Sequence, residues 1–113
     1  MKVDQLIPAV ERKVEFSLKA RKFVPASAGC YALSTFELDV LYVGLTDNLH
    51  RRFFQHRDTR NKREPTSMGM AFWFHFLTCD ERHIYRIERT WLNEHIELHG
   101  KRPVLNRMNS PIL

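Results

Sequence analysis

One carboxylate in this sequence lies where a helix would present apolar side chains. Residues 80–99 follow a helical repeat, and at about 100° per residue Glu88 lies about 40° from Ile84, inside the apolar stripe. The apolar members, all within about 100° of Ile84, are Ile84, Tyr85, Ile87, Trp91, Leu92 and Leu98. A carboxylate is rarely buried without a partner, because its desolvation costs several kcal/mol. Glu88 is therefore expected either to form a buried ion pair with an arginine of the first helix, or to hold a metal ion or a catalytic proton.

Two histidines near the end of the same helix, His95 and His99, have the i, i+4 spacing that suits two imidazole ligands of one metal ion. In zinc hydrolases with this spacing an acid directly follows the first histidine, whereas here Glu97 comes two residues later and points away. The sequence also offers no third ligand at a recognisable spacing. We expect hydrogen-bonded, partly buried histidines at this position rather than a zinc centre.

Positive charge is concentrated in residues 50–63. The chain has 18 Lys and Arg against 13 Asp and Glu, a net charge of +5. Outside this segment twelve basic residues balance twelve acidic residues, so the segment carries the whole net charge. Its six basic residues are Arg51, Arg52, Arg57, Arg60, Lys62 and Arg63. They stand beside Phe53 and Phe54, with Asp58 as the one acid of the segment. A basic patch on a neutral body is typical of a polyanion-binding protein such as a nucleic-acid binder, although a solvated basic face would have the same composition.

Length and composition exclude several classes of protein. A chain of 113 residues, 43% hydrophobic and 27% charged, suits one domain with a modest core. No run of about 18 apolar residues exists, so no membrane span is expected, and the first residues do not resemble a secretion signal. Cys30 and Cys79 are far apart and outside any Cys-x-x-Cys pattern, which fits a reducing compartment. We therefore expect a cytoplasmic protein with no membrane partner.

Three strands are expected to position these groups. Residues 29–35 and 40–45 are rich in aromatic and β-branched side chains and are separated by about four residues, which predicts a β-hairpin. Residues 70–78 alternate and predict a third strand. Consecutive strands joined by a tight hairpin are antiparallel. The sequence therefore predicts an α+β fold with a small, three-stranded antiparallel sheet flanked by helices.

Three helices are expected around this sheet. Residues 3–13 have helical spacing, although Pro8 limits the length of that helix. Asp47-Asn48 is a good N-cap for a helix that carries residues 49–56. Asp80 caps the long helix, which ends near His99 at Gly100. Residues 57–69 are polar and are expected to form a long exposed loop.

Five pieces of the chain, in order, resemble the core of the GIY-YIG nuclease family. The first three are Gly29-Cys30-Tyr31, Leu41-Tyr42-Val43-Gly44 and Asn48-Leu49-His50-Arg51-Arg52-Phe53-Phe54-Gln55-His56. Glu88 resembles the glutamate of the family's second helix, and Pro103-Val104-Leu105-Asn106 resembles its P-x-x-N tail. The resemblance covers residues 24–107. It implies a single nuclease domain over residues 1–113, with a helical extension over residues 1–23.

The resemblance implies a metal-dependent endonuclease acting on nucleic acid, with DNA as the first expectation. Phosphodiester hydrolysis needs an attacking water, a base and positive charge on the phosphate. Tyr31 and Tyr42, near neighbours across the hairpin, are expected to activate the water. Arg52 is expected to hold the phosphate, and His56, one turn further, to bond a tyrosine hydroxyl or the phosphate. Glu88 is the expected ligand of Mg²⁺ or Mn²⁺.

A further set of residues is expected at the substrate: Arg51, Arg57, Arg60, Lys62, Arg63 and Asn106. Of these, Asn106 is expected chiefly to hold backbone near the site. Two features depart from the family pattern. Leu45 stands where many members have lysine or another polar residue, so one phosphate contact is expected to be missing. The interval between Glu88 and Asn106 is long, which makes Glu94 a rival by spacing alone.

A non-catalytic nucleic-acid-binding module with the same fold is the main alternative, and a zinc hydrolase built on His95 and His99 is a third. Loss of the tyrosine pair, the arginine or the glutamate would favour the non-catalytic module, but all of them are present. The choice between DNA and RNA, and between duplex and branched substrates, stays open. Specificity would come from residues 57–69, the N-terminal segment, a homodimer or a partner protein.

Overall fold

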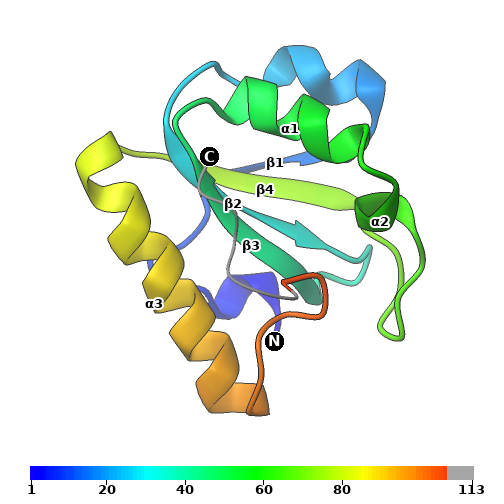
Figure 1. The fold of residues 1–113 in the computed structure, drawn as a ribbon, viewed down its shortest axis with the longest axis vertical. Helices are drawn as coiled ribbons and strands as arrows, with labels where there is room; N and C mark the ends of the chain where they lie inside the picture. Colours follow the sequence, from blue (N-terminus) through cyan, green and yellow to red (C-terminus); the bar gives the residue numbers. More distant parts are fainter. Residues whose placement is uncertain (107–113) are drawn as a thin grey trace.

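A sheet of four antiparallel strands, in the order β1-β4-β2-β3, forms the centre of the molecule (Figure 1). The computed structural model describes residues 1–106. The strands are β1 (Arg12–Glu15), β2 (Gly29–Ser34), β3 (Val40–Thr46) and β4 (Trp73–Thr78). The helices are α1 (Leu49–Arg57), α2 (Arg60–Arg63) and α3 (Glu81–His99), with two 3-10 helices, η1 (Val3–Gln5) and η2 (Leu18–Phe23). The predicted α+β class is confirmed, with four strands in place of the expected three.

The additional strand comes from the N-terminal segment, so the helix predicted over residues 3–13 is wrong. Only the short η1 forms there, and the chain then extends into β1, which pairs with β4. Trp91 Nε1 of α3 donates a hydrogen bond to the Pro8 carbonyl at 2.9 Å, and Leu6 is buried in the core. Packing against α3 and pairing with β4 satisfy this segment better than a short helix interrupted by proline.

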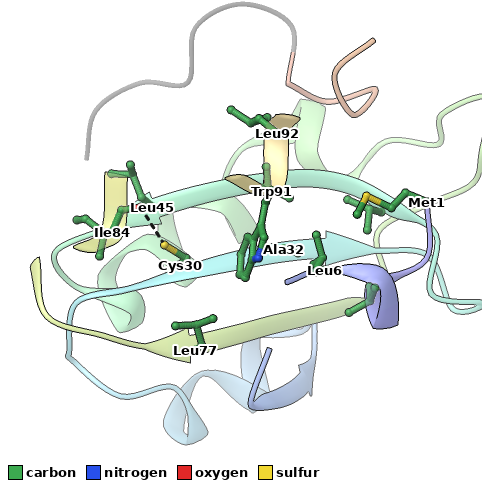
Figure 2. Close-up of a cluster of buried hydrophobic side chains, with 12 residues drawn as sticks. Met1, Leu6, Cys30, Ala32, Leu45, Leu77, Ile84, Trp91 and Leu92 are labelled. Carbon is green, nitrogen blue, oxygen red and sulfur yellow. Dashed lines mark hydrogen bonds between the residues drawn. The ribbon is translucent and has the colours of Figure 1, made fainter. Parts of the chain in front are cut away.

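Alternate residues of β2 contribute to two separate hydrophobic clusters. Cys30 and Ala32 belong to a cluster with α3, whereas Tyr31 and Leu33 belong to a cluster with α1. Figure 2 shows the first cluster, in which Trp91 points from α3 toward the sheet beside Ala32. Helices α1 and α3 therefore cover opposite faces of the sheet, and the Tyr31 side chain lies on the α1 face.

Local hydrogen bonds begin and end the helices where the sequence predicts. The Asn48 side chain accepts from a backbone N–H in the first turn of α1, and the Asp80 side chain does the same for α3. Gly100 ends α3 with a φ of 74°, a left-handed conformation that glycine adopts without strain. The segment 57–69, predicted as a loop, contains the single turn α2.

The buried stripe of α3 is narrower than the sequence predicts. Tyr85 and Leu98 are 52% and 55% exposed, so their assignment to the apolar stripe is wrong. Ile84, Trp91 and Leu92 are buried against the sheet. Within residues 1–106, neither α3 nor any other helix is long and apolar enough to cross a membrane.

Candidate active site

The Tyr31 hydroxyl lies at the centre of the candidate site, buried between α1 and the sheet. Its oxygen is 2.6 Å from His56 Nε2 and 3.3 Å from Arg52 Nε. Because the arginine N–H donates to the hydroxyl oxygen, the hydroxyl proton is available to the histidine. Arg52 and His56 lie one turn apart on α1, so both reach the same residue of β2. The structure thus places three of the predicted site residues in direct contact.

Burial keeps both members of the Tyr31–His56 pair neutral. Burial, followed by the positive charges of Arg52 and Lys62, lowers the pKa of His56 to about 3. Burial, together with Tyr42, raises the pKa of Tyr31 well above its ordinary value, although Arg52 opposes this. At neutral pH the resting pair is therefore a phenol hydrogen-bonded to an uncharged imidazole.

Tyr42 completes an aromatic group around this hydrogen bond. Its ring is stacked near that of Tyr31, with centroids 6.0 Å apart, and lies 5.1 Å from the His56 ring. Lys62 Nζ stands 4.7 Å from the centre of the Tyr42 ring, which is a cation–π contact. Burial raises the pKa of Tyr42, with a smaller contribution from the negative charge of Glu88, while Tyr31 and Arg52 oppose it.

Gly44 leaves the space that the Tyr31 ring occupies. The two residues are opposite each other in the β2–β3 pairing. A Cβ added at Gly44 would lie 2.5 Å from the Tyr31 hydroxyl oxygen and 2.6 Å from Cζ, closer than atoms can approach. Leu45, the next residue, belongs to the cluster on the opposite face of the sheet and is buried. The Leu45 side chain therefore faces away from the Tyr31 hydroxyl.

Glu88 is buried on α3, with 6% of its surface exposed, and its charge acts on Tyr42 across β3. The helix over residues 3–13 that was to supply an arginine partner for Glu88 does not form. The rival carboxylate, Glu94, accepts a hydrogen bond from the Ile7 backbone N–H at 3.2 Å. Glu94 therefore supports the N-terminal segment, and Glu88 is the carboxylate that lies nearer the tyrosines.

Asn106 holds the C-terminal segment against the outer edge of β3. Its Oδ1 accepts from the Val43 N–H at 2.9 Å, and its Nδ2 donates to the Val43 carbonyl at 2.8 Å. At the same edge of β3, the Leu105 N–H donates to the Leu41 carbonyl. These contacts give Asn106 a supporting position between Tyr42 and Gly44, as expected, rather than a position beside Arg52.

The other basic residues of segment 50–63 are spread over the surface around the site. Arg51 pairs with Asp47 at the start of α1. The Arg57 guanidinium lies 5.1 Å from the Phe16 ring, and its pKa is lowered by burial and by the charge of Arg63. Arg60 forms an exposed ion pair with Glu64 at 2.8 Å. Of the described residues in this segment, Arg52 and Lys62 are the cations that the structure brings to the tyrosines.

His95 and His99 are both hydrogen-bonded, as the sequence predicts. His95 Nδ1 donates to the Lys101 carbonyl at 2.6 Å, and His99 Nε2 lies 2.6 Å from the N-terminal amine of Met1. They line an open cavity of about 570 Å³ formed with residues 101–104. Within residues 1–106, no group of three or more His, Cys, Asp or Glu side chains is arranged to hold a metal ion.

Two residues of the site were not identified from the sequence. Gln55 accepts a hydrogen bond from Arg52 Nη1 at 3.0 Å and so helps to orient the guanidinium. Gln55 could have been identified from the sequence, because it lies three residues after Arg52 on a predicted helix and such side chains are neighbours. Phe74 of β4 stacks on Tyr31, with centroids 5.1 Å apart and planes 14° apart. Phe74 could be found only from the pairing of β2 with β4, which brings together residues distant in sequence.

Comparison with protein-family models gives a match to the GIY-YIG catalytic domain over residues 27–101. A comparison with curated proteins found no match. The matched range begins just before β2 and ends just after α3, so it includes the tyrosine pair, Arg52, His56 and Glu88. Domains of this family are nuclease domains, act on nucleic acid and generally use divalent metal ions. The order of motifs, the sheet with helices on both faces and the match over most of the sequence all show that this chain belongs to the GIY-YIG family.

Proposed function

We propose that this protein is an endonuclease that uses a divalent metal ion to hydrolyse phosphodiester bonds of nucleic acid, with DNA as the first candidate substrate. The observation that carries the proposal is the Tyr31 hydroxyl, which is held at once by Arg52 and by a neutral His56. A non-catalytic binding module would have no need of a buried phenol between a phosphate-binding group and a proton acceptor. The family membership supplies the general activity, and these contacts support the particular roles.

In this proposal Tyr31 and His56 move a proton together. The pKa of Tyr31 is too high for a resting tyrosinate, so the phenol takes the proton of the attacking water as it passes its own to His56 Nε2. Arg52 and Lys62 help to keep the pKa of His56 low in the free protein. A phosphate bound beside these two cations offsets their charge, which raises the pKa of His56 and makes it a better acceptor. Substrate binding thus prepares the proton transfer.

Arg52 and Lys62 are proposed to bind the scissile phosphate. The Arg52 guanidinium is fixed through Nε by Tyr31 and through Nη1 by Gln55, which lowers the entropy cost of orienting it toward a ligand. Its planar set of donors matches the oxygens of a phosphate. Lys62 contributes a more mobile charge above Tyr42. Both charges stabilise the additional negative charge of the transition state.

Glu88 fits the expected metal ion through the chemistry of its donor atoms. It is a buried carboxylate of α3 whose charge acts on Tyr42 across β3, and Mg²⁺ and Mn²⁺ prefer such hard oxygen ligands. One protein carboxylate suits Mg²⁺, which keeps most of its waters and binds substrate phosphate. When bound, the ion would supply positive charge to the phosphate and acidify a coordinated water.

The proposal is tested by incubating the protein with supercoiled plasmid in Mg²⁺ or Mn²⁺, with EDTA as the control. We expect nicked and linear products that EDTA prevents. Glu88→Gln should abolish them, whereas the matched variant Glu94→Gln, on the same helix but bonded to Ile7, should keep wild-type rates. Nucleic-acid binding without cleavage in either metal would overturn the proposal in favour of the binding module.

A further inference from the structure

We propose that a pocket beside the N-terminal half of α1 binds an unpaired nucleobase next to the scissile phosphate, so that the preferred substrate contains a single-stranded segment. The pocket has a volume of about 500 Å³. It is lined by Arg21, His50, Arg51, Phe54 and Gln55. The inference rests on the proposed function, because that function places a phosphate at Arg52, the neighbour of this pocket on α1.

The walls of the pocket are fixed by contacts between α1 and the segment that follows η2. The His50 backbone N–H donates to the Pro25 carbonyl at 3.0 Å, and its ring Nδ1 donates to the Val24 carbonyl at 2.9 Å. The Leu49 N–H donates to the Ser27 carbonyl. Because both walls are tied together in this way, the pocket is preformed rather than a gap between mobile parts.

An aromatic ring lines this pocket without serving the core. Phe54 is 42% exposed, whereas its neighbour Phe53 is fully buried. The Arg21 guanidinium lies 5.3 Å from the centre of the Phe54 ring. An exposed aromatic ring beside a cation is the arrangement on which proteins stack single-stranded bases, because every base offers a π-face and the cation attracts the backbone.

The charge around the pocket complements a nucleic-acid strand. Two of the residues that line the pocket, Arg21 of η2 and Arg51 of α1, are cations. Arg51 is also the ion-pair partner of Asp47. A surface of this kind attracts phosphates without reading sequence.

Gln55 connects the pocket to the candidate active site. It lines the pocket and also accepts the hydrogen bond from Arg52 Nη1. A nucleotide adjacent to a phosphate at Arg52 can therefore place its base at Phe54. In a duplex the bases are stacked and paired inside the helix, so only an unpaired base can enter the pocket.

The test is a binding measurement in EDTA, which separates it from cleavage. Equilibrium binding of the full chain is measured for labelled single-stranded, duplex and flap-containing oligonucleotides by fluorescence anisotropy. Phe54→Ala should weaken binding to the single-stranded and flap probes about tenfold, and duplex binding less than about twofold. Arg21→Ala should weaken binding to all three probes.

Phe23→Ala and Lys22→Ala are the matched controls. Lys22 Nζ lies 5.3 Å from the centre of the Phe23 ring, which is 58% exposed, and neither residue lines the pocket. Both control variants should keep the preference for single-stranded probes. An equal loss on every probe for Phe54→Ala, or the same selective loss for Phe23→Ala, would overturn the inference. A chain that binds as expected but never cleaves would overturn only the proposed function, and one that cleaves without the preference would overturn only this inference.

Discussion

Removing the Tyr31 hydroxyl separates its role in chemistry from its role in stability. Tyr31→Phe keeps the ring that packs between Tyr42 and Phe74 and deletes one atom, which contacts His56 Nε2 at 2.6 Å and Arg52 Nε at 3.3 Å. The variant leaves the buried His56 Nε2 without its present partner, at a cost of about 1–3 kcal/mol. For a domain of this size we expect the melting temperature to fall by roughly 4 °C per kcal/mol.

The rate should fall much further than this stability loss explains. If Tyr31 transfers the proton of the attacking water, its removal should slow cleavage by about 10²–10⁴-fold. Initial rates of plasmid nicking, measured well below the melting temperature of the variant, give the loss of cleavage rate. Circular dichroism melts give the loss of stability. Tyr85→Phe serves as the control, because that hydroxyl belongs to an exposed side chain near the start of α3. A folded Tyr31→Phe variant that loses less than about tenfold in rate would refute the proton-transfer role.

Other perturbations follow from the same contacts. Glu88→Gln should remove metal-dependent cleavage while leaving the free energy of unfolding equal or higher, since a buried charge is lost; a large loss of stability in urea titrations would instead indicate a structural ion pair. Burial lowers the pKa of His56 to about 3 and that of His75 to about 4, below the ordinary 6.5, so the unfolded chain binds protons first as the pH falls. Protonation of each histidine in the unfolded chain should therefore lower the free energy of unfolding by about 2 kcal/mol between pH 6.5 and 5. A His56→Gln variant whose free energy of unfolding falls as steeply with pH as that of the wild type would contradict this. Replacing the four cations of residues 57–63 with alanine should weaken binding equally across sequences and flatten its salt dependence, by about 0.9 in log–log slope per lost phosphate contact on B-DNA; an unchanged slope would place the nucleic-acid surface elsewhere.

The elements predicted correctly from the sequence are those determined by local interactions. Asn48, Asp80 and Gly100 mark helix ends because each acts on backbone groups within a few residues. The hairpin follows similarly from a short loop between two β-rich runs. The motifs that resemble the family lie on these local elements, which is why the expected residues could be assigned to elements before their contacts were known.

The features that were not predicted from the sequence depend on contacts between segments that are distant in sequence. Strand β1 is short and charged, as edge strands often are, so its sequence has little strand character, and its pairing with β4 determines its structure. Tyr85 and Leu98 fall within the apolar angle of α3, but the width of the sheet beneath the helix decides which positions are covered. The place of Lys62 over Tyr42 depends on α2, which folds within a segment too polar to predict as anything but a loop.

The two hydrogen bonds between Asn106 and Val43 also bear on how this chain avoids self-association. Strand β3 is at the edge of the sheet, and an uncovered edge is a template on which a second molecule can add its own strand. Residues 105–106 occupy backbone groups of this edge at Leu41 and Val43. A chain shortened to residue 100 would present them, and we expect it to aggregate through β3 even though its helices and sheet remain complete. Residues 105–106 therefore protect the strand that carries Tyr42, and the Asn106–Val43 contact does so over a sequence separation of 63 residues.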